Sequence, residues 1–167
     1  NHVETKTQLL QAILPHVAFG GWSETAFCAA CDDSEIELSQ ARLVFPRRAL
    51  DLAVSFHMSG DTAMLTQMNE SDLSTMRFRD KVAAAVRFRL EAVEDKEAVR
   101  RGAALFALPQ NAALGARLIW GTADTIWTGL GDSSTDVNWY TKRTTLSAVY
   151  GSCVLFWLGD DSPHHAA

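Results

Sequence analysis

Residues 131–143, with the sequence GDSSTDVNWYTKR, gather the side chains of this chain that are best suited to chemistry. Two carboxylates stand there with Trp139, Tyr140, Lys142 and Arg143, between two strongly apolar stretches. Aromatic side chains flanked by charge combine a large rigid contact area with polar groups that orient a partner. The segment offers no convincing nucleophile with its own base, so it predicts recognition rather than catalysis.

A hydrolase is the sharpest enzymatic alternative. The triplet Gly131-Asp132-Ser133 and the later run from Asp161 to His164 look like the GDS and DxxH elements of the GDSL hydrolases, in which serine attacks and histidine is the base. That nucleophile follows a strand of an α/β fold, and this sequence offers no parallel strands. Helix capping explains Asp132 and Ser133 better, and we predict that the protein is not an enzyme.

The spacing of Cys and His gives little support to metal or cofactor chemistry. Cys28 and Cys31 form a CxxC pair, but no further Cys or His stands nearby to complete a zinc site, and the βαβ context of a thioredoxin motif is absent. Small apolar side chains at i and i+3 of a helix are ordinary core packing. His16 and His57 stand alone on predicted helices and are expected to be structural. We therefore predict no metal site and no cofactor.

The composition favours one globular domain in a reducing compartment. Of the 167 residues, 47% are hydrophobic and 21% are charged, which is enough apolar material for a core. The three cysteines cannot pair completely. The first residues are polar, with no basic stretch before an apolar one, so no signal or transit peptide is expected.

Helical periodicity recurs along the chain, and no alternation of period two is long enough for a strand. Leu9, Leu10, Ile13 and Val17 follow helical spacing until two glycines stop the run. Further helices are expected over residues 23–32, 39–44, 47–68, 78–90, 96–108, 112–130 and 144–158. Gly60 is a point where the longest of them could bend. The sequence therefore predicts an all-α fold.

One predicted helix carries an apolar stripe that repeats every four residues, made of Phe78, Val82, Val86 and Leu90. Arg89 falls largely off that stripe, together with other basic side chains of the same helix. The stripe is expected to face the core.

The last two predicted helices are unusual in their lack of charge. Only two charged residues occur between residues 112 and 130, and residues 144–158 carry none. A span of that length falls short of the ~20 residues that cross a bilayer. Such helices must be buried on several sides, by their own domain and by a second subunit or a ligand. Ser133 and Asp136 have capping-box spacing for the last helix.

The first four predicted helices resemble the DNA-binding head of TetR-type repressors in their order and spacing. Five acidic residues and no basic residue lie between positions 24 and 37, where a DNA-binding head would face phosphates. Only Gln40 and Arg42 are available to contact base edges. Arg47 and Arg48 follow as solvated helix-start charges. We therefore predict that the head does not bind nucleic acid.

Several segments resemble the coenzyme Q biosynthesis accessory family, called Coq-nine, along nearly the whole chain. They are HVAFGGW, LVFP, RFRDKVAAAVRFRLEAV, ADTIW and GDSSTDVNWYTKR. The last is long and chemically mixed, so chance agreement is improbable, although Val137 stands where the family usually has Phe. The resemblance implies a TetR-like helical bundle with a helix-turn-helix-like head, a homodimer formed through the last long helices, and no DNA binding.

The resemblance also implies a site for a partner and a site for a lipid. The partner-facing residues are Asp136, Trp139, Tyr140, Lys142 and Arg143. The lipid-binding residues are Val86, Leu90, Leu118, Trp120, Trp127, Leu130, Leu146, Tyr150 and Trp157. In a single domain spanning residues 1–167, the head takes residues 5–46, the lipid-binding and dimerisation helices take residues 47–160, and a tail takes residues 161–167.

The function implied by the resemblance is that of a non-catalytic accessory protein of ubiquinone biosynthesis. It would bind an isoprenoid quinone precursor or a phospholipid and present the precursor to the demethoxyubiquinone hydroxylase. Family members continue into further helices, one of which contacts the membrane. The expected place is the bacterial cytoplasm or the mitochondrial matrix, peripheral on the inner membrane. The alternative function is a TetR-type transcriptional regulator with a lipid effector.

Overall fold

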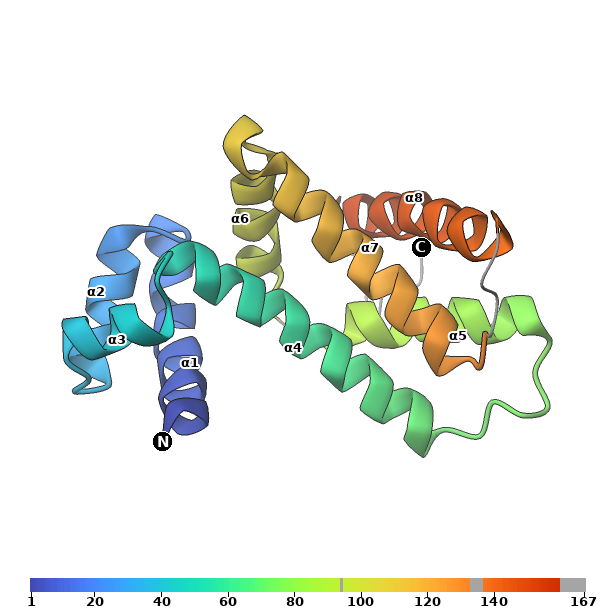
Figure 1. The fold of residues 1–167 in the computed structure, drawn as a ribbon, viewed down its shortest axis with the longest axis horizontal. Coiled ribbons are helices and arrows are strands. Elements are labelled where there is room, and N and C mark those ends of the chain that lie inside the picture. The colour runs from blue at the N-terminus through green and yellow to red at the C-terminus, as the bar shows by residue number, and fades with distance from the viewer. Residues whose placement is uncertain (94, 133–136, 160–167) are drawn as a thin grey trace. The chain divides into compact units, whose positions relative to one another are not determined.

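The computed structural model describes residues 1–93, 95–132 and 137–159. These ranges form helices without any strand, which confirms the all-α fold. The helices are α1 (His2–Gly20), α2 (Glu24–Asp33), α3 (Leu38–Val44), α4 (Ala49–Glu70), α5 (Phe78–Glu91), α6 (Lys96–Ala107), the 3-10 turn η1 (Pro109–Asn111), α7 (Ala112–Gly129) and α8 (Val137–Gly159) (Figure 1). No helix in these ranges combines the length and apolarity that a membrane-spanning segment requires.

A glycine marks the end of α1, and a side-chain cap marks the start of α2. The side chain of Ser23 accepts a hydrogen bond from the Ala26 backbone N–H at 3.2 Å, as an N-cap does. Gly21 follows α1 with a φ of 69°, a conformation that glycine adopts without strain. The predicted stop at the glycine pair and the predicted start at Ser23 are both confirmed.

The chain divides into two compact units. The head unit contains Asn1–Met58 and Asp95–Ala112, and the bundle unit contains Ser59–Glu94 and Ala113–Ala167. The head is therefore larger than the predicted residues 5–46, because the start of α4 and all of α6 belong to it. That the two units act as one domain stays a prediction.

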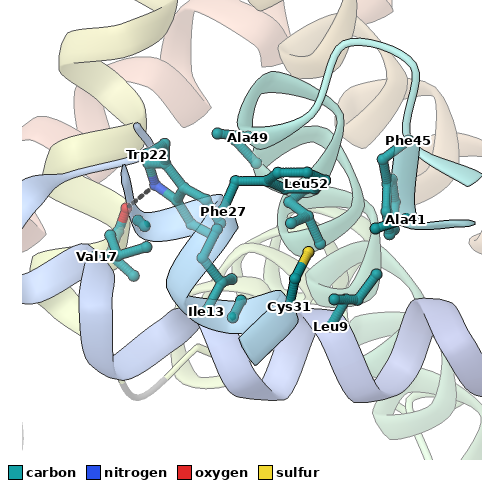
Figure 2. Close-up of a cluster of buried hydrophobic side chains, with 14 residues drawn as sticks. Leu9, Ile13, Val17, Trp22, Phe27, Cys31, Ala41, Phe45, Ala49 and Leu52 are labelled. Atoms are coloured by element: carbon teal, nitrogen blue, oxygen red, sulfur yellow. Dashed lines mark hydrogen bonds between the residues drawn. The ribbon is translucent and has the colours of Figure 1, made fainter. Parts of the chain in front are cut away.

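An apolar core joins the helices of the head unit. Leu9, Ile13 and Val17 of α1 are fully buried, as their spacing predicted. Figure 2 shows the side chains of α1, α2, α3 and α4 gathered around this core. The indole Nε1 of Trp22 donates a hydrogen bond to the Ala98 carbonyl of α6 at 3.1 Å. Ala98 is also buried in this core, and Leu105 and Phe106 of α6 pack against it.

A second apolar core holds the bundle unit together. Its buried members are Met64, Met68, Ala85, Val86, Ala123, Ile126, Leu146 and Tyr150, from α4, α5, α7 and α8. Burial raises the pKa of the Tyr150 hydroxyl, although the nearby Arg89 guanidinium opposes the shift. The hydroxyl therefore stays protonated across the neutral range.

A buried ion pair lies within the bundle unit. Arg89 is only 4% exposed, and its Nε donates to Asp61 Oδ1 at 2.8 Å. The Thr122 hydroxyl donates to the same oxygen at 2.7 Å. Arg89 is therefore buried although its position lies off the predicted apolar stripe, whose first residue, Phe78, is 48% exposed. The carboxylate partner of Arg89 is on α4, so Arg89 can satisfy its charge inside the unit.

Gly60 leaves room for this ion pair. Helix α4 is continuous through Gly60, and a bend at this position stays a prediction. A Cβ at this position would lie 2.3 Å from Arg89 Nη1 and 2.4 Å from the guanidinium carbon. The missing side chain leaves the space that the buried guanidinium fills.

Candidate partner-binding site

The junction between α7 and α8 is built around Arg143. The guanidinium Nε donates to Asp124 Oδ1 at 2.6 Å, and Nη1 donates to Asp132 Oδ2 at 3.0 Å. The guanidinium carbon also lies 4.5 Å from the centre of the Trp139 ring, within the range of a cation–π interaction. Arg143 is 1% exposed. The expected surface position of Arg143 is therefore wrong, because two carboxylates and a ring enclose its charge.

Burial and hydrogen bonding act in opposite directions on the pKa of Arg143. Burial disfavours the charged form and by itself would lower the pKa. The hydrogen bonds to Asp124 and Asp132 outweigh burial, and the pKa is raised. Arg143 therefore stays charged and holds the junction as an ionic anchor.

Lys142 forms an ion pair with the carboxylate of Asp132, which Arg143 also binds. Its Nζ lies 2.8 Å from Asp132 Oδ1 and 5.5 Å from the centre of the Trp127 ring. The Trp127 indole N–H donates to the Lys142 carbonyl at 3.0 Å, which fixes the start of α8 against α7. Only a capping role was predicted for Asp132. In the structure, its carboxylate binds two cations.

Three aromatic rings meet beside this ionic anchor. The centre of the Trp120 ring lies 5.7 Å from that of Trp139 and 5.3 Å from that of Tyr140, and both pairs are tilted. Tyr140 is 60% exposed, whereas Trp139 is half-buried. The prediction that at least one of the two adjacent aromatics is exposed is confirmed. We call Trp120, Trp139 and Tyr140 the aromatic platform.

Asp136, the remaining predicted partner-facing residue, lies outside the described residues, as does its capping partner Ser133. The same holds for Asp161 and His164 of the hydrolase alternative. Of the predicted partner-facing residues, the structure therefore brings together Trp139, Tyr140, Lys142 and Arg143.

Most of the predicted lipid-binding residues meet in the core of the bundle unit. Six of the nine belong to that core or pack against it: Val86, Leu90, Trp127, Leu130, Leu146 and Tyr150. Leu118, Trp120 and Trp157 stand outside this group. The structure thus shows one continuous apolar interior where the resemblance implied a lipid site. Lipid binding itself stays a prediction.

The isolated His and Cys residues have structural surroundings. His16 Nε2 lies 2.6 Å from Asp33 Oδ2, which confirms a satisfied structural histidine. Cys31 is buried in the head core, and burial raises its pKa, as does the neighbouring Cys28. Both cysteines are free thiols. Core packing is thus confirmed for Cys31.

An open hollow of about 460 Å³ lies at the turn between α2 and α3. It is lined by Cys28, Cys31, Asp32, Glu35, Ile36, Glu37 and Leu38. Across the ranges that the structure describes, no three His, Cys, Asp or Glu side chains are arranged to hold a metal ion. The hollow therefore gives no independent support to a metal site at the CxxC pair.

The arginines of the head are paired with acidic side chains of the same unit. Arg48 Nε lies 3.0 Å from Glu24 Oε2, and Arg42 approaches the other oxygen of Glu24 at 3.6 Å. Arg47 Nε lies 2.7 Å from Asp51 Oδ1. These pairs reduce the positive charge that the head could offer to phosphates, which disfavours DNA binding.

The chain is similar to proteins named for ubiquinone biosynthesis. A family model described as COQ9 matches residues 112–167, which include the α7–α8 junction. A probable ubiquinone biosynthesis protein coq9, mitochondrial, from Dictyostelium discoideum is 28% identical over 98% of this chain and 55% of its own length. The COQ9 proteins of Drosophila melanogaster and Homo sapiens are 29% and 26% identical over 96% and 93% of the chain.

The chain spans about half the length of these relatives, 51% for the fly and human proteins. The match nevertheless runs through both units, because it covers nearly all of the chain. The chain is thus similar to COQ9 proteins, through the family model over its last third and through these relatives over almost its whole length.

Proposed function

We propose that this protein is a non-catalytic accessory protein of ubiquinone biosynthesis, which binds an isoprenoid quinone precursor and presents it to the demethoxyubiquinone hydroxylase. The observation that carries the proposal is the α7–α8 junction. There, an exposed Tyr140 stands on a buried ionic anchor, within the residues that the COQ9 model matches. Rigidly held exposed aromatics are typical of protein-binding surfaces.

The ionic anchor makes the surface suitable for binding because it fixes the aromatic side chains before a partner arrives. Arg143 packs on the Trp139 ring, and it also donates to the Trp139 carbonyl at 3.2 Å. Ordering side chains on binding costs about 0.5–1.5 kcal/mol for each flexible group. A surface ordered in advance avoids much of that cost.

The apolar interior of the bundle unit is the proposed place of the lipid. Met64 and Met68 lie in that core, and methionine side chains adapt to irregular shapes. A polyprenyl tail gains about 0.8 kcal/mol for each buried CH2, so a few isoprene units would offset the cost of leaving a bilayer. Entry of the tail requires the helices to part, because the residues concerned pack against one another in this structure.

We further propose that the protein works as a homodimer and does not bind nucleic acid. Leu155 and Phe156 are exposed near the end of α8, in a stretch without charge. An exposed apolar patch of this kind is typical of an interface between subunits. The names of the relatives, which are called mitochondrial, support a mitochondrial location. We propose the matrix, peripheral on the inner membrane, as the place within it.

Replacing Tyr140 by Ala tests the partner surface. The side chain is largely exposed, so the melting temperature should change little. Affinity for purified hydroxylase, measured by calorimetry, should fall at least about tenfold. Phe19→Ala is the matched control, since Phe19 is 90% exposed in the head unit and should have no effect. Equal affinity of Tyr140→Ala and wild type would contradict the proposed surface.

The lipid is tested separately on the wild-type protein. Native mass spectrometry of protein purified from cells, followed by solvent extraction, should reveal an isoprenoid quinone or a phospholipid bound to each chain. Protein that carries no lipid, even after incubation with vesicles containing quinone precursor, would contradict the carrier role.

A further inference from the structure

Cys28 and Cys31 lie three residues apart on α2, so their side chains share one face of the helix. In a helix, Cα atoms at this spacing are about 5 Å apart, which falls within the range of about 4.4–6.8 Å found in disulfides. The Cβ atoms are about 5–6 Å apart, whereas a disulfide brings them to about 3.5–4.5 Å. Both side chains are free thiols, and neither thiol forms a hydrogen bond with a residue that the structure describes. A local shift of about 1–2 Å in the last turn of α2 would therefore join the two sulfurs.

The open hollow at the turn between α2 and α3 makes the pair accessible. Both cysteines line it. Cys31 is only 3% exposed and packs in the head core (Figure 2), whereas Cys28 is half-buried. The acidic lining residues are Asp32, Glu35 and Glu37, and their charges repel an anionic oxidant such as glutathione disulfide but not an uncharged peroxide. A small neutral oxidant therefore reaches Cys28 first.

The turn that follows Cys31 depends on the position of this residue. The Ile36 N–H donates to the Cys31 carbonyl at 3.0 Å, and this bond closes the end of α2. Glu35, between them, has a φ of 54°, a left-handed conformation that is costly for a residue other than glycine. The hydrogen bonds of the turn hold Glu35 in that conformation. Moving Cys31 towards Cys28 would therefore pull on the bond to Ile36 and loosen the turn.

We propose that Cys28 and Cys31 are a redox switch, in which an uncharged peroxide converts the two thiols into a disulfide that loosens the turn between α2 and α3. The inference is independent of the function proposed above. Closing the disulfide strains the last turn of α2, and strained disulfides are easily reduced. The bond therefore acts as a reversible switch of the head unit rather than as a permanent cross-link.

The reaction balances with hydrogen peroxide as the oxidant. Burial raises the pKa of the Cys31 thiol, as does the neighbouring Cys28, so the less buried Cys28 is the first nucleophile. Its sulfur attacks one peroxide oxygen, the O–O bond breaks, and the leaving hydroxide takes the thiol proton to form water, which leaves Cys28 as a sulfenic acid. The Cys31 sulfur then attacks the Cys28 sulfur, an S–S bond replaces the S–O bond, and the leaving hydroxide takes the Cys31 proton. The two thiols have lost two protons and two electrons, and the peroxide has become two waters.

Hydrogen peroxide tests the pair in the wild-type chain. After oxidation, the protein is denatured in N-ethylmaleimide, which labels the thiols that remain. We expect Cys28 and Cys31 to escape labelling together while Cys153 is still labelled, and the tryptic peptide of residues 7–42 to be lighter by two hydrogen atoms. Cys153→Ser is the matched control and should form the same disulfide. Full labelling of Cys28 and Cys31, or oxidation of Cys153 before this pair, would overturn the inference.

Hydrogen exchange followed by mass spectrometry tests the effect on the turn. In the oxidised protein, the Ile36 amide should exchange at least about tenfold faster, because its bond to the Cys31 carbonyl is strained, and a thiol reductant should reverse the change. Exchange along α7 in the bundle unit is the internal control and should not change. Cys28→Ser cannot form the disulfide, so peroxide should leave its turn as it was. A disulfide that forms without faster exchange at Ile36 would overturn the switch.

Discussion

Arg143 and Arg89 each place a full positive charge inside the bundle unit, and each depends on carboxylates from another helix or turn. Removing one partner of a buried pair leaves an uncompensated charge, which typically costs about 3–5 kcal/mol. The two arginines differ in their partners. Arg143 has two carboxylates and a ring, whereas Arg89 shares Asp61 with the Thr122 hydroxyl.

We expect Arg143→Ala to lower the free energy of unfolding by about 2–4 kcal/mol, slightly less than for a fully buried pair, because Lys142 still binds Asp132. Lys142→Ala should cost less than about 1 kcal/mol, since its ammonium is partly exposed and Arg143 remains on Asp132. Urea denaturation of both variants measures the difference. Equal losses for the two variants would contradict Arg143 as the anchor.

For single residues, the exposed aromatic was predicted from the sequence, but the buried arginines were not. Trp139 and Tyr140 are adjacent on a helix, so geometry alone keeps them from both facing inward. Arg143 and Arg89 find carboxylates that are 19 and 28 residues away in the chain. A periodic pattern within one helix contains no information about such partners, and it assigns a basic residue to solvent by default.

The helices of the bundle unit show how one small residue permits a buried charge. Gly60 of α4 faces the Arg89 guanidinium, and Asp61 beside it supplies the counter-charge. A glycine inside a helix costs about 1 kcal/mol relative to alanine. At position 60 this cost is offset, because a methyl group there would clash with the Arg89 guanidinium that Asp61 binds.

Gly60→Ala is therefore expected to destabilise the protein by about 1–3 kcal/mol, despite the better helix propensity of alanine. Gly121 on α7 is the matched control. A Cβ there would meet nothing within 4 Å, so Gly121→Ala should be neutral or stabilising by up to about 1 kcal/mol. Thermal melts compare the two variants. A stabilised Gly60→Ala protein would show that the guanidinium moves aside at little cost.

Most helix positions were predicted from periodicity and capping residues, whereas the helix expected over residues 144–158 begins earlier, at Val137. The division of the helices into two units was not predicted. The start at Ser23 and the stop at the glycine pair depend on neighbours in sequence, which the sequence shows directly. The membership of α6 in the head unit rests on long-range contacts, namely the apolar packing of Ala98, Leu105 and Phe106 and the Trp22–Ala98 hydrogen bond between residues 76 positions apart. Contacts of that kind are set by packing and leave no local pattern.

For the molecule as a whole, the uncharged α8 raises the question of what covers its outer side. The helix buries Leu146, which is 4% exposed, among the core residues of the bundle unit. Val149 is 49% exposed, and Leu155 and Phe156 are exposed further along. The outer side of α8 thus carries exposed apolar side chains among uncharged polar ones, and we propose that a second copy of the chain covers it.

We expect Val149→Arg to convert a wild-type dimer into a folded monomer, because a charged side chain at the centre of the outer face would lose its water in the interface. Light scattering after size exclusion should give half the wild-type mass, and the circular dichroism spectrum should stay helical. Ala83→Arg on α5 is the control, since Ala83 is also exposed on a helix and should leave the mass unchanged. A Val149→Arg protein with unchanged mass would place the interface elsewhere. Leu146→Arg does not answer the question, because that side chain lies in the core and its replacement would unfold the unit in either case.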